Sequence, residues 1–233
     1  MTVLHFADGG EAGDVAAFLA RLLHYDRGAA VRLQAAGTAL AVFGRPPSFE
    51  VLAIRAARLA KPYENGLDVA LDVTVSAGEL LETVDESAAT LTVPAAVTGP
   101  PWAGMLPPRG GWQPEPGLPA PDALRAMVAA AIAEFRSRTQ ELTPELRTRA
   151  ELDRIGREIW TRTVGDTRLP VRAVHAAQSL GFLRPARQGP GAPASGEAPL
   201  ALVSSGPWLR LRTPYGSIAV RRAGLGALDV SVR

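Results

Sequence analysis

The chain has 233 residues, of which 47% are hydrophobic and 21% are charged, with a formal net charge of +2 and no cysteine. Such a chain can bury a sizeable core, and its composition excludes a largely disordered protein. The lack of cysteine excludes disulfides, thiolate metal sites and cysteine nucleophiles. No apolar run reaches the roughly 18 residues of a membrane-spanning helix, so we expect a soluble cytoplasmic protein without membrane contact.

The charge is unevenly distributed. Residues 1–118 carry 8 basic and 13 acidic side chains, whereas residues 119–233 carry 17 basic and 10 acidic ones. This asymmetry predicts either an anionic partner for the second half or docking of the two halves on each other. All basic residues except Lys61 are arginine, a bias typical of a GC-rich bacterial genome. Some arginines therefore reflect composition and carry no recognition role.

Residues 1–96 predict an α+β domain with an antiparallel sheet and two helices. Apolar residues repeat at helical spacing over 14–25. The predicted strands are 30–35, 39–43, 49–55, 67–75 and 89–93, with turns at Gly37-Thr38 and Asn65-Gly66. Ser76 and Glu79 have the spacing of a capping box, so we expect a short helix over 77–84.

Residues 97–121 predict a connecting strap of a different kind. Eight prolines alternate with glycines and with Trp102 and Trp112. Proline lacks a backbone donor, which excludes a helix or an interior strand. Because exposed indoles leave much apolar surface in water, we expect an ordered strap with both tryptophans packed on one of the halves. The alternative is a polyproline-type ligand for an aromatic groove on a partner.

Residues 122–233 predict a helical domain that ends in a β-hairpin. The predicted helices are 122–139, 144–164 and 170–180. The predicted strands are 200–203, 208–212, 217–222 and 228–232. Thr143 is the expected N-cap of the second helix, with Pro144 as its first helical residue, and Gly181 ends the third.

No residue pattern assigns a reaction. The three histidines, His5, His24 and His175, are far apart and do not have the spacing of metal ligands or of a nucleophile and its base. Asp68 and Asp72 share one strand face, where paired carboxylates can bind magnesium or transfer protons, although such a pair is more typical of a solvated face. There is no glycine-rich phosphate loop. We therefore assign no catalytic residue, metal or cofactor and expect a non-catalytic protein.

The strongest functional feature is the arginine-rich region 168–222, which contains eight arginines and one acid, Glu197. From residue 122 on, the expected order is helix, helix, shorter helix and hairpin. This order resembles that of a winged helix-turn-helix, in which the third helix enters the major groove and the hairpin contacts phosphates. The resemblance is limited to element order: the middle helix is long, and a Pro/Gly loop separates the third helix from the hairpin. We expect the binding residues to be Arg168, Arg172, Trp208, Arg210, Arg212, Tyr215, Arg221 and Arg222.

DNA is the most concrete ligand for these arginines, provided that they gather on one exposed surface. The alternative is a protein partner or a homodimer, because tryptophan and arginine are also enriched at the energetic centres of protein interfaces. In a strand over 208–212, Trp208, Arg210 and Arg212 share one face, which fits either ligand.

Overall fold

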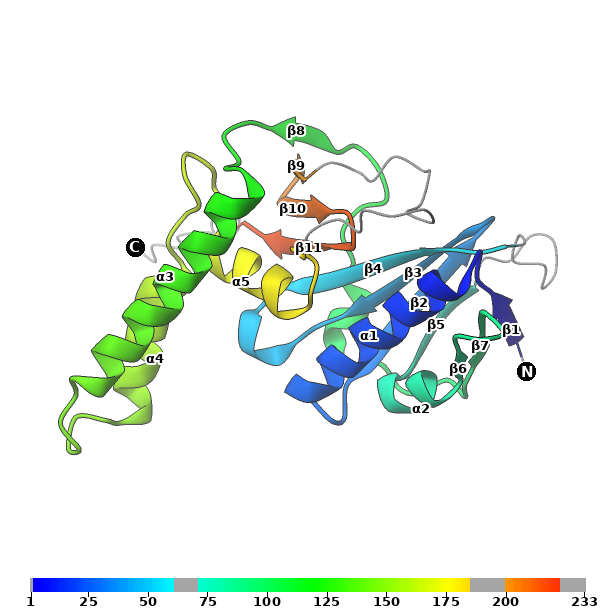
Figure 1. The fold of residues 1–233 in the computed structure, drawn as a ribbon, viewed down its shortest axis with the longest axis horizontal. Helices are drawn as coiled ribbons and strands as arrows, with labels where there is room; N and C mark the ends of the chain where they lie inside the picture. Colours follow the sequence, from blue (N-terminus) through cyan, green and yellow to red (C-terminus); the bar gives the residue numbers. More distant parts are fainter. Residues whose placement is uncertain (1, 61–70, 185–199, 223–233) are drawn as a thin grey trace, which may run out of the picture.

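A computed structural model describes residues 2–60, 71–184 and 200–222 of the chain. Its central element is an eight-stranded antiparallel sheet that runs through both halves of the sequence (Figure 1). In spatial order its strands are β5 (Leu71–Ser76), β2 (Ala30–Ala36), β3 (Ala39–Gly44), β4 (Leu52–Arg58), β11 (Gly216–Arg221), β10 (Trp208–Thr213), β9 (Ala201–Ser205) and β8 (Gln113–Glu115). A small sheet is formed by β1 (Thr2–His5), β7 (Thr90–Val93) and β6 (Val84–Asp85). The predicted α+β class is confirmed.

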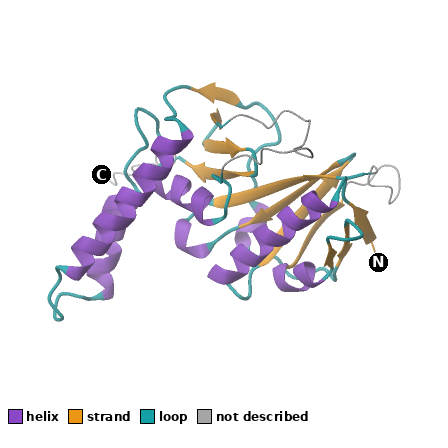
Figure 2. Ribbon diagram, viewed as in Figure 1, coloured by secondary structure: helices purple, strands orange, loops and turns teal. Residues whose placement is uncertain are grey.

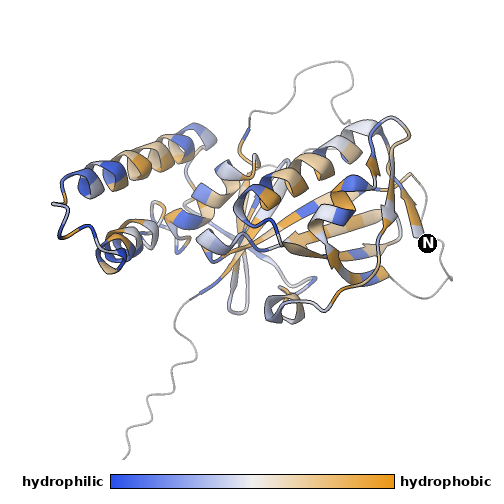
Figure 3. Cartoon of the chain, turned by 90° about the horizontal axis from the view of Figure 1, so that it is seen from below, coloured by the Kyte–Doolittle hydropathy of each residue, from blue (hydrophilic) through white to orange (hydrophobic). Residues whose placement is uncertain are grey.

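Helices cover one face of the large sheet (Figure 2). The helices are α1 (Gly9–Tyr25), α2 (Ala77–Glu82), α3 (Pro121–Gln140), α4 (Arg149–Trp160) and α5 (Val171–Ser179), with 3-10 turns η1 (Pro47–Phe49) and η2 (Pro101–Gly104). Helices α1 and α5 pack on the sheet, and α3 and α4 form a hairpin that packs on α5 and projects from the body. Hydrophilic and hydrophobic residues are mixed along the projecting α3–α4 hairpin (Figure 3). Within the described part of the chain, no helix combines the length and apolarity needed to cross a membrane.

The strap covers the opposite face of the sheet. Trp102 and Leu106 pack on a second apolar cluster, formed by Phe43, Leu52, Ile54 and Ala219. The backbone N–H of Val97 donates to the Thr74 carbonyl at 2.9 Å, and the Arg32 guanidinium donates to the Ala103 carbonyl. The strap also contributes β8, where Pro114 is tolerated because the strand lies at the sheet edge.

Strands β4 and β11 join the two halves of the chain. Ser217, Ile218 and Ala219 pair with Ile54, Ala53 and Leu52. Beside this pairing, the buried Arg55 guanidinium donates to the Tyr215 carbonyl at 2.8 Å and to carboxylates of Glu11 and Asp14 at 3.1 and 3.2 Å. Asp14 also accepts from Arg184 at 2.5 Å. Helix α1 and the C-terminal half are thus held by one buried network of charges.

The structure adds three strands that were not predicted, β1, β6 and the short edge strand β8 within the strap, and it corrects the start of one helix. Helix α4 begins at Arg149, because Thr148 accepts a hydrogen bond from the Glu151 N–H at 3.3 Å and is the N-cap; Thr143 instead begins a turn. The predicted Asn65-Gly66 turn and the 228–232 strand lie outside the described residues.

The resemblance to a winged helix is not confirmed. Strands β10 and β11 lie inside the sheet, because β9 pairs with one side of the hairpin and β4 with the other. A wing would have to be free to reach a DNA backbone. Helix α5 buries Val171, Ala173, Val174, Ala176 and Ala177 against its neighbours, which leaves little of it to enter a groove.

An aromatic stack fixes α5 against α4 and η1. The His175 ring stacks on Trp160 with centroids 4.6 Å apart, and the Phe49 ring lies nearly perpendicular to it with centroids 5.0 Å apart. Burial lowers the pKa of His175 below its ordinary value. The neutral imidazole is therefore the form that the folded protein favours.

Replacing Arg55 with alanine should lower the free energy of unfolding by about 3 kcal/mol, because Glu11 and Asp14 would keep their partly buried charges with one partner fewer. Urea unfolding measures this change in the free energy of unfolding. The matched control is Arg154→Ala, which removes an arginine from an exposed ion pair on α4 and should have a much smaller effect. Equal losses in the two variants would show that the buried network does not stabilise the fold.

Acidification should destabilise the protein through His175. Since its pKa is lower in the folded state, the unfolded state binds the proton more readily, and the free energy of unfolding should fall as the pH drops below about 6.5. Chemical unfolding at several pH values would compare the wild type with His175→Phe, which should lose this component. Parallel pH profiles would contradict the assignment.

Candidate binding groove

Two adjoining cavities form a groove along one end of the large sheet. The wide cavity has a volume of about 650 Å³ and the narrow cavity about 250 Å³, and both are lined by Arg45 and Trp102. The wide cavity lies within the size range of small-molecule sites. These two cavities together are called the groove.

The antiparallel topology explains why chemically different residues meet there. The groove lies where β5, β3 and β11 end and where β2, β4 and β10 begin. Thus Arg45 follows the last residue of β3, Arg221 ends β11, and Trp208 begins β10. Trp208 and Arg221 are directly paired across the hairpin. The strap completes the groove by placing Trp102 over this end of the sheet.

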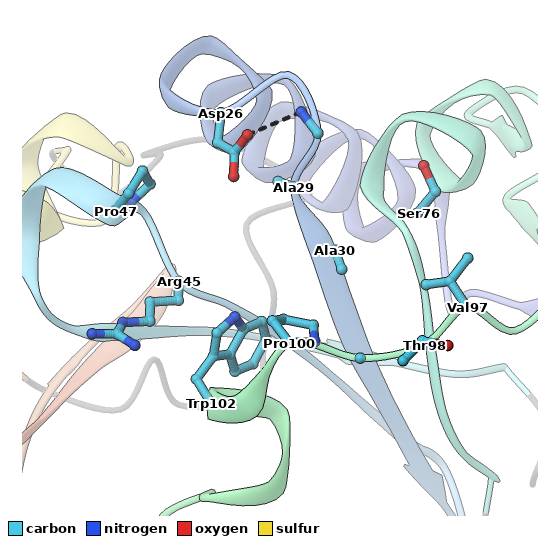
Figure 4. A pocket seen from close by; sticks show the side chains of 12 residues that line it. Asp26, Ala29, Ala30, Arg45, Pro47, Ser76, Val97, Thr98, Pro100 and Trp102 are labelled. Carbon is cyan, nitrogen blue, oxygen red and sulfur yellow. Dashed lines mark hydrogen bonds between the residues drawn. The ribbon is translucent and has the colours of Figure 1, made fainter.

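The wide cavity has a polar rim and an aromatic wall (Figure 4). Asp26 lies across the cavity from Trp102, and Arg45 lies beside the indole. Ser76 and Thr98 contribute hydroxyl groups. Val97, which also lines this cavity, is 39% exposed, an unusual position for a large apolar residue in this structure. The cavity therefore offers both an apolar surface and hydrogen-bonding groups.

The narrow cavity is strongly cationic. Among the described residues, its charged lining consists of Arg45, Arg172 and Arg221 against one acid, Glu50. Glu50 lies 3.9 Å from the Arg172 Nε, and the Arg221 guanidinium lies 5.9 Å from the Trp208 ring centroid. Arg45 is exposed and has no ion pair with any described residue. Two positive charges thus remain without an acidic partner in this part of the described structure.

Three of the eight predicted binding residues, Arg172, Trp208 and Arg221, meet in the narrow cavity. Arg168 is exposed in the loop before α5 and lines neither cavity. Arg222 donates from its guanidinium to the Gly206 carbonyl and supports the turn between β9 and β10.

The other three predicted residues are not arranged as expected. Arg210 donates to the Ser217 hydroxyl at 2.8 Å and lies 5.7 Å from the Trp112 ring, so the strap shields it. This burial, together with the neighbouring charge of Arg212, lowers the pKa of Arg210 to about 10. Arg212 lies on the same face and is partly exposed. Tyr215 is buried under Arg184, whose guanidinium lies 3.7 Å above the ring, so this ring cannot stack on a ligand.

Sequence reasoning did not identify Arg45 and Trp102 as site residues. Arg45 was interpreted only as part of a strand break with Pro46-Pro47, and Trp102 only as an anchor of the strap. The available signal was a tryptophan within a proline-rich connector, which indicates contact with a folded surface but not which surface. Among the described residues, no group of three or more histidine, aspartate or glutamate side chains could hold a metal ion.

The protein is thus of the α+β class and has a cavity lined by cationic and aromatic side chains. Residues 107–225, just over half of the chain, match the family described as domain of unknown function (DUF8185), and the chain belongs to this family. Residues 1–104 match the domain of unknown function DUF8010. The comparison with curated proteins found no match, and neither did the comparison with solved structures. The groove is lined from both matched regions.

Proposed function

We propose that this chain is a non-catalytic binding protein whose groove holds single-stranded DNA. The observation that carries the proposal is the convergence of Arg45, Arg172 and Arg221 with Trp102 and Trp208 around one cavity. Proteins that bind single strands combine a positive groove along the backbone with aromatic rings on which bases stack.

A single strand fits this geometry better than a duplex does. Reading a duplex would require a protruding helix or ribbon in the major groove. Helix α5 is mostly buried, and the hairpin is paired on both sides. The groove instead places indoles beside guanidinium groups in a concave surface, which an unpaired and flexible chain of nucleotides can enter.

A protein partner is the second candidate. Met105 in the narrow cavity is 53% exposed and Val97 in the wide cavity is 39% exposed. Exposed apolar residues that line a groove also favour a peptide segment with acidic and apolar side chains. The salt dependence of binding separates the two candidates, because release of counterions is characteristic of nucleic acids.

The double variant Arg45→Ala, Arg221→Ala should weaken binding of a fluorescent oligothymidylate of about twelve nucleotides by about tenfold or more. Each contact with a single-stranded phosphate contributes about 0.7 to the slope of log K against log salt, so the slope should fall by about 1.4. Fluorescence anisotropy at several salt concentrations measures both quantities.

The matched control is Arg136→Ala, Arg149→Ala, which removes the same charge from exposed positions on the α3–α4 hairpin. Its affinity and salt slope should remain close to those of the wild type. A wild type that does not bind the oligonucleotide, or two double variants with equal losses, would overturn the proposal.

A further inference from the structure

The wide cavity carries a carboxylate oriented by the backbone. Asp26 follows α1, and its Oδ1 accepts a hydrogen bond from the Gly28 N–H at 3.0 Å. This Asx turn holds the side chain in place. Figure 4 shows the second carboxylate oxygen directed toward the cavity. No hydrogen bond joins that oxygen to any described residue, so it can accept from a ligand.

Opposite Asp26, Trp102 offers the surface for a planar ring. Stacking on an indole does not by itself distinguish one base from another, because every base has a π-face. Discrimination requires a polar group at the ring edge, and Asp26 is the one acid among the described residues that line this cavity. Arg45, which lines both cavities, can donate hydrogen bonds to the phosphate of the same nucleotide.

An ionised carboxylate is only an acceptor, so it favours a ring edge with adjacent donors. The Watson–Crick edge of guanine presents two neighbouring donors, the N1–H and the N2 amino group. In adenine and cytosine the amino group lies beside a ring nitrogen that is itself an acceptor. In thymine, carbonyl oxygens flank the single N–H. The second Asp26 oxygen can therefore accept from both neighbouring donors of guanine, whereas an acceptor beside the donor repels it in the other bases.

We propose that the wide cavity is a guanine pocket, in which Asp26 accepts from the Watson–Crick edge, Trp102 stacks on the ring, and Arg45 binds the adjoining phosphate. The proposal deepens the proposed function and rests on it where the guanine belongs to a DNA strand. The same chemistry would recognise a free guanine nucleotide, so the experiment must distinguish these two sources.

The test compares two oligonucleotides by anisotropy: an oligothymidylate and the same strand with one central thymidine replaced by deoxyguanosine. The wild type should bind the guanine-containing strand about tenfold more tightly, the size of a good bidentate contact with a base. Asp26→Asn should abolish this ratio, and it should raise the affinity for oligothymidylate because it removes a negative charge from the groove. Asparagine retains the oxygen that accepts from Gly28 but replaces the second oxygen with a donor, so the turn is preserved.

Glu50→Gln is the matched control, because it removes the same charge from the narrow cavity without changing the wide one. It should raise the affinity for both strands and leave their ratio unchanged. A third arm titrates the protein with GMP and with AMP by calorimetry. GMP binding that depends on Asp26, in the absence of binding to either strand, would support the guanine pocket and assign it to a free nucleotide while overturning the proposed function.

The opposite result is equally informative. Oligothymidylate binding that depends on Arg45 and Arg221, with no preference for guanine and no preference for GMP over AMP, would overturn the guanine pocket and leave the proposed function standing. A guanine preference that persists in Asp26→Asn would also contradict the guanine-pocket proposal, since the carboxylate would then not be the group that distinguishes guanine from thymine.

Discussion

The pairing of β4 with β11 is the constraint on which the rest of the structure depends. It turns two separate groups of strands into one sheet and places the start of β4 beside the end of β11. The groove lies at that end, with Arg45 and Trp102 from the first matched region and Arg172, Trp208 and Arg221 from the second. Neither set alone forms the cavity. The site therefore exists only when both regions share the sheet.

The excess arginines of the second half have two different surroundings. Some contribute to docking: Arg184 of the second half binds Asp14 of the first, and Arg172 lies near Glu50. The cations at the end of the sheet are not neutralised to the same degree, because the narrow cavity has three arginines and one glutamate. The charge asymmetry predicted either docking of the two halves or an anionic ligand. On this surface the two are compatible, because some arginines pair with acids of the first half while others are left for a ligand.

Local patterns were sufficient for most of the fold. The apolar periodicity of α1, the capping box at Ser76 and the alternation in β10 all led to the observed elements. The start of α4 was misplaced because Thr143-Pro144 was interpreted as the helix start, although Thr148 and Glu151 have the same capping-box spacing as Ser76 and Glu79. Sheet order could not be predicted, since the partner of β11 is distant in sequence. For the same reason the composition of the groove was only partly predictable, and the strap that shields Arg210 was not expected there.

Intrinsic fluorescence offers the most direct test of whether the groove is the ligand site. In a Trp112→Phe, Trp160→Phe variant, Trp102 and Trp208 are the two remaining tryptophans, and both line the narrow cavity. Titration with oligothymidylate should quench this emission with the same midpoint as the anisotropy change, because bases stack on these indoles. Binding that changes anisotropy but leaves the fluorescence of both indoles unaltered would place the ligand elsewhere and contradict the account.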